Sequence, residues 1–314
     1  MAIAFTFPGQ GSQSVGMGKA LAEQFSVARQ VFEEVDEALG EKLSSTMFEG
    51  PEDVLTLTAN AQPALMAVSM AIIKVMQSLG LNLPQKVQYV AGHSLGEYSA
   101  LCAAGMFSLA DTARLLRIRG NAMQKAVPVG QGGMAAIIGL EASDVNAICA
   151  EASSLGACQI ANDNGGGQLV ISGVLAAVEK AASLASEKGA KRALMLPVSA
   201  PFHSVLMQPA GDAMAEALAE VQKHQPVIAL VANVTAEPVR DEKLIADLLV
   251  AQVTGQVRWR ETIEWFGNND VDTLYEVGTG KVLTGLARRI NKDITGRPVN
   301  TGAEIEEALK ELGV

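Results

Sequence analysis

Aromatic residues make up only 4% of the 314 residues, and the chain has just three cysteines and three histidines. The apolar share of 49% comes instead mainly from Ala, Val, Leu and Met, a mix that favours helices packed on a sheet over an aromatic-rich β-sandwich. Cys102, Cys149 and Cys158 follow neither a CxxC pattern nor a metal-ligand spacing. They predict buried, reduced thiols in a cytosol, and no metal site.

Positive charge is also scarce, since 24 Lys and Arg stand against 34 Asp and Glu, for a formal net charge of −10. This balance argues against nucleic acid or an anionic membrane as partner, and an acidic partner would need a local basic patch. The start, MAIAFTFPGQ, meets Pro8 too early for a signal peptide. The longest apolar run is interrupted by Lys74 and falls short of the roughly 18 residues that span a membrane. We therefore expect a soluble, cytoplasmic monomer.

Strand and helix patterns alternate along most of the chain, which is typical of a parallel sheet flanked by helices. The expected strands are residues 2–7, 87–92, 227–233 and 274–278. Helices are expected around 17–39, 61–80, 97–105, 110–126 and 204–223. The rhythm predicts an α/β fold with a hydrolase-like core.

The middle of the chain has a different order of elements. Strands are expected at 133–139, 157–162, 168–173 and 191–198, with helices at 143–153 and 176–189. The order β-α-β-β-α-β is the split unit of ferredoxin-like folds. Glycine-rich segments at 129–133 and 164–168 bracket or interrupt it. We interpret residues 127–198 as an inserted ferredoxin-like α+β subdomain, with 1–126 and 199–314 forming the large α/β catalytic domain.

The motif GHSLG at 92–96 follows an expected strand and precedes an expected helix. In that context a G-x-S-x-G turn raises its serine above the carboxyl end of the sheet, and the two glycines let the chain reverse sharply. The Leu95 amide then points to where an acyl oxyanion would form, near a helix N-terminus. The alternative is a glycine-bordered turn with an incidental serine. The strand–turn–helix context favours Ser94 as a nucleophile.

A serine nucleophile needs a base, and only His93, His203 and His224 are available. His93 adjoins Ser94 in the turn, where strand-like alternation points its side chain away from the serine. His224 lies in the polar segment VQKHQP, which is typical of a solvated surface. His203 lies in a proline-containing loop between a strand and a helix. A lone loop histidine is often structural, but elimination favours His203 as the base.

Arg119 is turned toward the interior by its place on the 110–126 helix, where it shares a face with Leu116 and Met123. An unpaired guanidinium is costly in an apolar environment, so Arg119 needs a carboxylate partner. That partner is either an internal Asp or Glu or the carboxylate of a substrate. In the second case the transferred acyl group would be a dicarboxylic half-ester.

Five motifs occur in a fixed order along the chain: FPGQGSQ, GHSLGEYSAL, IRGNAMQ, SAPFHSVLM and VGTGKVLTGL. Together they resemble the malonyl-CoA:acyl carrier protein transacylases of type II fatty acid synthesis, over essentially the whole length. The resemblance implies that Ser94 is the acylated serine, His203 the general base and Arg119 the residue that binds the malonyl carboxylate. The amide of Gln10 would join Leu95 in the oxyanion hole.

The resemblance also implies a set of residues around the acyl group. The main-chain carbonyl of Gln252 would orient His203 in place of the usual acid, and Phe202 would narrow the pocket around the α-carbon. Asn162 aligns with an asparagine near the acyl pocket, and Met123 shares the Arg119 face. The substrate site is therefore expected to comprise Arg119, Gln252, Phe202, Met123 and Asn162. The implied reaction is ping-pong transfer from malonyl-CoA to the phosphopantetheine thiol of acyl carrier protein, without metal or redox cofactor.

Three other functions compete with this one. A thioesterase or lipase would share the serine turn, but α/β-hydrolases place an acid between serine and histidine and the histidine late, and here more than 100 residues follow His203. A discrete polyketide-synthase acyltransferase would use the same residues. A non-catalytic acyl-binding module is disfavoured by the intact pair of Ser94 and His203.

Basic residues gather at two places despite the net charge. They are Lys191 and Arg192 at the border of the expected insert, and Arg288, Arg289 and Lys292 on a late helix. They either flank the cleft and dock the acidic carrier protein or form an ordinary solvated face.

Overall fold

The strand β1 (Ala2–Phe7) lies inside a six-stranded mixed sheet whose order is β10-β9-β1-β2-β7-β8. The computed structural model describes residues 2–198 and 200–314; Met1 and Ser199, at which the two expected segments of the large domain begin, lie outside them. The other strands are β2 (Tyr89–Gly92), β7 (Ala229–Val231), β8 (Pro238–Val239), β9 (Val271–Val277) and β10 (Thr295–Val299). All neighbours pair in parallel except β7 and β8.

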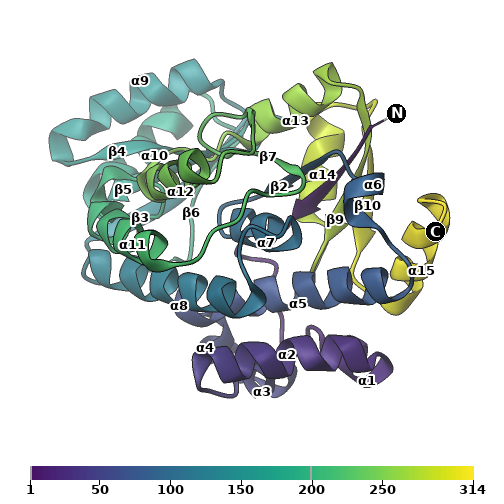
Figure 1. Ribbon diagram of the computed structural model, residues 1–314. Coiled ribbons are helices and arrows are strands. Elements are labelled where there is room, and N and C mark those ends of the chain that lie inside the picture. The colour runs from purple at the N-terminus through teal and green to yellow at the C-terminus, as the bar shows by residue number, and fades with distance from the viewer. Residues whose placement is uncertain (1, 199) are drawn as a thin grey trace.

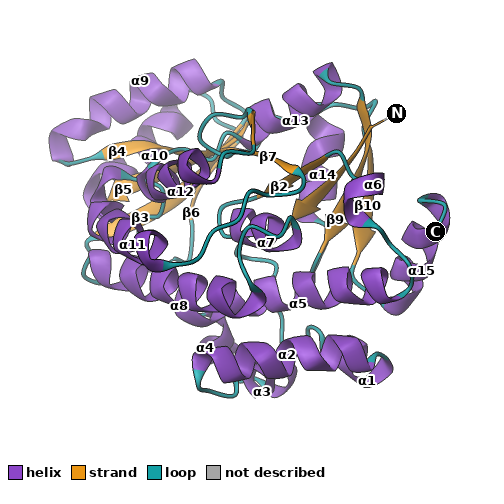
Figure 2. Ribbon diagram, viewed as in Figure 1, coloured by secondary structure: helices purple, strands orange, loops and turns teal. Residues whose placement is uncertain are grey.

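Both faces of this sheet are covered, because β1 alternates its side chains between two apolar clusters. Phe5 and Phe7 pack into a cluster with residues of α5, whereas Ala4 packs with Trp259 and Leu283 on the other side. Figures 1 and 2 show α5 and α8 between the sheet and the group α1–α4. The helices around the sheet are α1 (Lys19–Gln24), α2 (Ser26–Leu39), α3 (Leu43–Glu49), α4 (Glu52–Thr56), α5 (Thr58–Ser78), α6 (Leu83–Lys86), α7 (Gly96–Ala103), α8 (Leu109–Ala126), α11 (Gln208–Glu220), α12 (Glu242–Thr254), α13 (Trp259–Asn268), α14 (Val282–Ile290) and α15 (Gly302–Glu311).

Helix α5 is long and apolar enough to cross a membrane by length and composition, despite Lys74. Within the fold, however, 83% of its apolar window is buried. Its side chains pack against α2, α7 and α8 in the main cluster. The helix is therefore accounted for as a core helix.

The middle segment forms a second, separate sheet of four antiparallel strands in the order β4-β5-β3-β6. It has its own apolar cluster, formed with the helices α9 and α10. Figure 1 shows this part of the ribbon at the upper left. Its elements are β3 (Gly132–Ile138), α9 (Ala142–Ala152), β4 (Cys158–Asp163), β5 (Gln168–Val174), α10 (Leu175–Glu187) and β6 (Arg192–Met195). The order β-α-β-β-α-β expected from the sequence is confirmed.

The expected elements are found with shifted ends. Of the strand predicted at 191–198, only the part from Arg192 to Met195 forms a strand, β6. The helix predicted at 204–223 consists of a short 3₁₀ turn, Val205–Met207, followed by α11. The pattern over 17–39 divides into α1 and α2 at Phe25, whose backbone is extended. Helices α3, α4 and α6 and strands β8 and β10 were not expected, because they are short and carry little periodicity.

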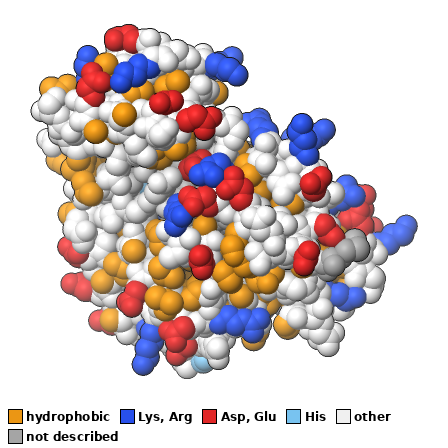
Figure 3. Space-filling model, turned by 90° about the horizontal axis from the view of Figure 1, so that it is seen from above, with side chains coloured by type: hydrophobic (Ala, Val, Ile, Leu, Met, Phe, Trp, Pro, Cys, Tyr) orange, Lys and Arg blue, Asp and Glu red, His pale blue; other side chains and the backbone are white. Residues whose placement is uncertain are grey.

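Charged side chains of both signs are interspersed on the face seen in Figure 3.

Cys102 and Cys149 are buried and Cys158 is partly exposed, and all three thiols are free. The sulfur atoms of Cys149 and Cys158 lie 3.6 Å apart as a hydrogen-bonded pair. The expected reduced thiols are thus present, although Cys158 is less buried than expected.

The close approach of α5 and α8 depends on Gly120, and we expect Gly120→Ala to destabilise the protein by about 1–3 kcal/mol. An added Cβ would lie 2.6 Å from Ala59 Cα and 2.8 Å from the Thr58 carbonyl oxygen. The matched control is Gly285→Ala in α14, where a Cβ would meet nothing within 4 Å and should stabilise the helix by about 0.5–1 kcal/mol. Urea unfolding of both variants measures the difference, and equal midpoints would contradict the packing argument.

Candidate active site

Ser94 occupies a sharp turn between β2 and α7, with a left-handed backbone conformation (φ 55°) that is uncommon for a residue with a side chain. The flanking glycines are required by space. A Cβ on Gly92 would lie 1.9 Å from the Gly96 carbonyl carbon, and one on Gly96 would lie 2.3 Å from the Phe7 oxygen. The turn therefore accepts only glycine at both positions, and it presents Ser94 half-exposed at the end of the sheet.

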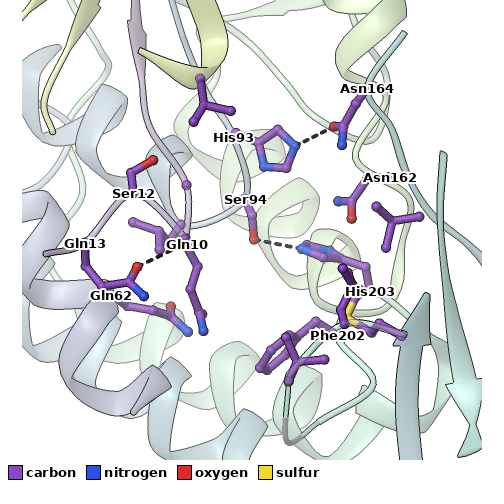
Figure 4. A pocket seen from close by; sticks show the side chains of 18 of the residues that line it. Gln10, Ser12, Gln13, Gln62, His93, Ser94, Asn162, Asn164, Phe202 and His203 are labelled. Carbon is purple, nitrogen blue, oxygen red and sulfur yellow. Dashed lines mark hydrogen bonds between the residues drawn. The ribbon is translucent and has the colours of Figure 1, made fainter. Parts of the chain in front are cut away.

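His203 reaches Ser94 from the loop after β6, with 2.7 Å between Ser94 Oγ and His203 Nε2 (Figure 4). Its Nδ1 lies 2.8 Å from the carbonyl oxygen of Gln252 and 3.1 Å from that of Gly255. Carbonyl oxygens only accept hydrogen bonds, so Nδ1 carries the proton and Nε2 is left to accept one from the serine hydroxyl. His203 also has a left-handed backbone (φ 57°), so two strained residues face each other.

The electrostatics of the site keep this imidazole neutral. Burial, followed by the positive charge of Arg119, lowers the pKa of His203 to about 3. The two carbonyl contacts oppose that shift without cancelling it. At neutral pH the histidine can therefore take a proton from Ser94.

Arg119 is 1% exposed, and its guanidinium binds only uncharged groups among the described residues 2–198 and 200–314. Nη1 donates to Gln62 Oε1 at 2.7 Å, and Nη2 donates to Gln252 Oε1 at 2.7 Å and to Ser94 Oγ at 3.1 Å. Its Nε has no hydrogen-bond partner there, and the ring of Tyr98 lies 5.7 Å from Cζ. Within the described part of the chain, no Asp or Glu oxygen lies within 4.0 Å of an Arg119 nitrogen, so the alternative of an internal salt bridge is not found there.

Ser94, His203 and Arg119 line one cavity of about 480 Å³ between the large sheet and the middle segment. Figure 4 shows its walls, with Gln10 and Gln62 on one side and Asn162 and Phe202 on the other. The residues singled out from the sequence that line this cavity are Gln10, Ser94, Leu95, Arg119, Met123, Asn162, Phe202 and His203. Gln252 lies behind the wall, fully buried, and touches both Arg119 and His203.

Two main-chain amides near Ser94 are available to a ligand. Among the described residues, the N–H groups of Leu95 and Gln10 make no hydrogen bond. Leu95 immediately precedes α7, where the helix N-terminus favours negative charge. The Gln10 side chain is engaged elsewhere, because its Oε1 accepts a hydrogen bond from Thr58 at 2.8 Å.

Several residues of the site carried no clear signal in the sequence. His93 lines the same cavity as Ser94, but its Nε2 contacts Asn164 Oδ1 at 2.9 Å and not the serine. Asn233 Oδ1 accepts the Ser94 N–H at 2.8 Å from a loop after β7. Among these residues, Glu97 alone had a signal in the sequence, because it is an acidic residue one turn after Ser94 in a helix whose other residues are mostly apolar. His224 is exposed, as expected.

The basic residues lie on the surface near the cavity. Arg288, Arg289 and Lys292 are exposed at the end of α14, whose Val282, Leu283 and Leu286 line the cavity. Arg289 Nη1 contacts Gln168 Oε1 at 3.4 Å, and Lys191 packs beside Gly139 of the middle segment. Across the described residues, no group of three or more His, Cys, Asp or Glu side chains could hold a metal ion.

Comparison with known proteins places this geometry in a family. The acyl transferase domain family matches residues 4–292. The malonyl CoA-acyl carrier protein transacylase of Bacillus subtilis is 43% identical over 311 residues, 99% of this chain and 97% of that protein. The transacylase of the same description from Escherichia coli K12 is 43% identical and covers 98% of both chains.

Solved structures agree over the full length. An acyl-carrier-protein S-malonyltransferase from Bartonella henselae has a TM-score of 0.99, 69% identity and complete coverage of both chains. A malonyl-transacylase in complex with a type II PKS acyl-carrier protein has a TM-score of 0.96 and 41% identity, covering 99% of this chain and 100% of that one. The chain therefore belongs to the acyl transferase family, among the malonyl CoA-acyl carrier protein transacylases.

Proposed function

We propose that this protein transfers a malonyl group from malonyl-CoA to the phosphopantetheine thiol of acyl carrier protein through a malonyl-Ser94 intermediate. One observation carries the proposal: Ser94 Oγ lies 2.7 Å from the imidazole of His203 and 3.1 Å from the guanidinium of Arg119 inside one cavity. A nucleophile, a neutral base and a buried cation whose hydrogen-bond partners are uncharged together suit an acyl thioester that ends in a carboxylate.

In the first half-reaction, Ser94 Oγ attacks the thioester carbonyl carbon while its proton passes to His203 Nε2. The N–H groups of Leu95 and Gln10 stabilise the negative charge on the carbonyl oxygen. The C–S bond then breaks, and the departing CoA sulfur takes the proton from His203. The second half-reaction reverses these steps, with the carrier-protein thiol as nucleophile, so the overall mechanism is ping-pong.

Gln252 takes the place of the usual triad acid at His203, since its main-chain oxygen holds Nδ1–H at 2.8 Å. A carbonyl fixes the tautomer without adding a negative charge beside the imidazole. This difference distinguishes the site from the α/β-hydrolase triad. The carboxylate acid of a thioesterase or lipase triad is replaced here by two carbonyl oxygens.

Arg119 binds the distal malonyl carboxylate in substrate and intermediate alike, so it supplies selectivity and positioning more than rate. Met123 and Phe202 form apolar walls that limit the volume beside the α-carbon. Asn162, buried in β4, supports the acyl pocket. An acetyl group would leave the guanidinium unpaired, which favours malonyl over acetyl.

The same proposal covers the organisation and setting of the enzyme. Residues 127–198 are an inserted ferredoxin-like subdomain on a hydrolase-like core, an interpretation supported by the strand order β4-β5-β3-β6. The transfer needs no metal or redox cofactor, because every step moves only a proton and an acyl group. A monomer in the cytoplasm serving fatty acid synthesis suits this chemistry, and a polyketide pathway would use the same residues.

Carrier-protein docking is assigned to the basic residues beside the cavity. Arg288 and Arg289 end the helix that lines one wall, and Lys292 follows it. Lys191 and Arg192 lie at the start of β6 in the middle segment. Arg289 reaches Gln168 across the boundary between them. An acidic carrier would thus meet positive charge at the cavity despite the net charge of −10.

Ser94→Ala is expected to abolish the malonyl adduct, because it removes the hydroxyl that lies 2.7 Å from His203 Nε2. Intact-protein mass spectrometry after malonyl-CoA exposure measures the adduct, and added carrier protein should discharge it from the wild type. CoA release that continues without any thiol acceptor would identify a hydrolase instead. Absence of an adduct in the wild type would revive a non-catalytic acyl-binding module.

Arg119→Ala is expected to lower kcat/KM for malonyl-CoA by roughly 10–150-fold, the range of a lost charge-assisted hydrogen bond, while some acetyl transfer remains. The matched control is Arg117→Ala on the same helix, whose guanidinium instead binds Asn60 and Glu41. Steady-state kinetics with malonyl-CoA and acetyl-CoA give the ratio for each variant. Retained malonyl preference in Arg119→Ala would place the carboxylate elsewhere.

Replacing Arg288 and Arg289 together by Ala should raise KM for carrier protein, most clearly at low salt where screening is weak. The effect should not extend to malonyl-CoA hydrolysis or adduct formation if the two residues act only in docking. The control pair is Arg29→Ala with Arg114→Ala, which removes the same charge from exposed ion pairs. Unchanged carrier-protein kinetics at low salt would leave these residues as a solvated face.

A further inference from the structure

Glu97 is an acidic side chain buried behind Ser94, and the transfer mechanism above does not use it. It lies in the first turn of α7 and is 2% exposed. Its Oε1 accepts the main-chain N–H of Asn233 at 2.6 Å, and its Oε2 accepts a hydrogen bond from Gln252 Nε2. Glu97 therefore touches two residues that in turn contact the reacting groups.

The first of these two residues supports the serine turn. Asn233 Oδ1 accepts the Ser94 N–H at 2.8 Å, and its Nδ2 donates to the Gly92 oxygen at 2.7 Å. Through Asn233 the carboxylate of Glu97 helps to hold the strained backbone of Ser94 in place.

The second residue, Gln252, connects Glu97 to Arg119. Its Nε2 donates to Glu97 Oε2 and, at 2.9 Å, to the main-chain carbonyl oxygen of Ser94. Its Oε1 accepts a hydrogen bond from Arg119 Nη2 at 2.7 Å. An ionised carboxylate can only accept hydrogen bonds, so the amide must turn its NH₂ group toward Glu97. The amide oxygen is then left facing Arg119. The reverse orientation would set NH₂ against the guanidinium N–H and oxygen against carboxylate.

We propose that Glu97 is a positioning residue whose carboxylate fixes the Gln252 amide and thereby holds Arg119 aimed at the acyl end of the cavity. It thus sets the selectivity for an acyl group that ends in a carboxylate. This inference rests on the proposed malonyl transfer. It assigns to a buried acid without substrate contact a part of the specificity carried by Arg119.

The contacts of Glu97 favour the ionised, acceptor-only form that this role needs, and that form prevails above about pH 7. Burial raises the pKa of Glu97 to about 7, against the hydrogen bonds from Asn233 and Gln252 and the charge of Arg119, which favour ionisation. A buried carboxylate costs desolvation energy, and a neutral side chain of the same shape would avoid that cost. The ionised form has a specific use here, because it accepts at both oxygens and so holds the NH₂ group of Gln252 on the side away from Arg119, together with the main-chain oxygen of Ser94.

Glu97→Gln tests the proposal, since it keeps the shape and removes the acceptor-only character. The new amide can accept at only one of the two positions where Glu97 accepts. With its NH₂ group toward Gln252 it opposes that amide or turns it over, and Arg119 then loses its oxygen partner. With its NH₂ group toward Asn233 it opposes that main-chain N–H instead. We expect the ratio of kcat/KM for malonyl-CoA to that for acetyl-CoA to fall by roughly tenfold or more, mainly through KM for malonyl-CoA. Acetyl transfer should change less.

Glu97→Asp is the companion variant, because it shortens the side chain but keeps the charge. Malonyl preference should survive better in Glu97→Asp than in Glu97→Gln, whereas thermal stability should fall more in Glu97→Asp, which leaves a packing defect. Glu304→Gln, at the capping box of α15, is the matched control for losing a carboxylate that accepts main-chain N–H groups. It should leave the ratio unchanged.

Both acyl groups are measured on the same preparation, so the ratio reports only the folded enzyme even where part of a sample unfolds. An unchanged ratio in Glu97→Gln, or equal losses for both acyl groups in parallel with a lower Tm, would overturn the positioning role. A wild type that forms no malonyl adduct would instead overturn the proposed function. The two failures are therefore distinguishable.

Discussion

The organisation of this site depends on a buried guanidinium that no carboxylate contacts among the residues that the structure describes. Arg119 is held by the amide oxygens of Gln62 and Gln252, from two different helices, and by the hydroxyl of Ser94. Amide dipoles orient the cation but leave its charge uncompensated at close range, and its burial lowers the pKa of Arg119. A ligand carboxylate is the natural group to complete such an environment. The close packing of α5 and α8 at Gly120 makes this arrangement possible.

The positive charge of Arg119 also affects His203. It is one of the causes, after burial, that lower the pKa of His203 and keep the imidazole neutral. A carboxylate at Nδ1 would oppose this effect, whereas the carbonyl oxygens of Gln252 and Gly255 fix the tautomer with little charge. The charge of Arg119 and the protonation state of His203 are therefore coupled, and Gln252 contacts both side chains.

The sequence predicted those parts of the site that depend on local pattern. The turn at Ser94 follows from glycines whose Cβ atoms have no room, and the inward face of Arg119 follows from helical spacing. His203 was reached by elimination. Gln62, Asn164 and Asn233 were out of reach, because amides give no periodic signal and their contacts join positions 57 to 139 residues apart. Likewise, the main strand and helix order was predictable, while short elements such as α6 and β8 depend on tertiary contacts.

Hydrogen bonds join the middle segment to the loop that carries His203, and no sequence pattern predicts them. Gln159 of β4 donates to the main-chain oxygens of His203 and Thr254, both at 3.2 Å, and accepts the Val205 N–H at 3.1 Å. Further along the strand, Val257 pairs with Ala161 and Asp163 through main-chain hydrogen bonds of 2.8 and 2.9 Å.

These contacts bracket Gly255, whose oxygen lies 3.1 Å from His203 Nδ1. The strand that supplies the Asn162 wall of the cavity therefore also holds the backbone at His203 and Val205 and on both sides of Gly255. Because His203 has a strained backbone, it needs such support from several directions to stay within reach of Ser94. The four-stranded sheet thus helps to position His203 beside Ser94, in addition to lining the cavity.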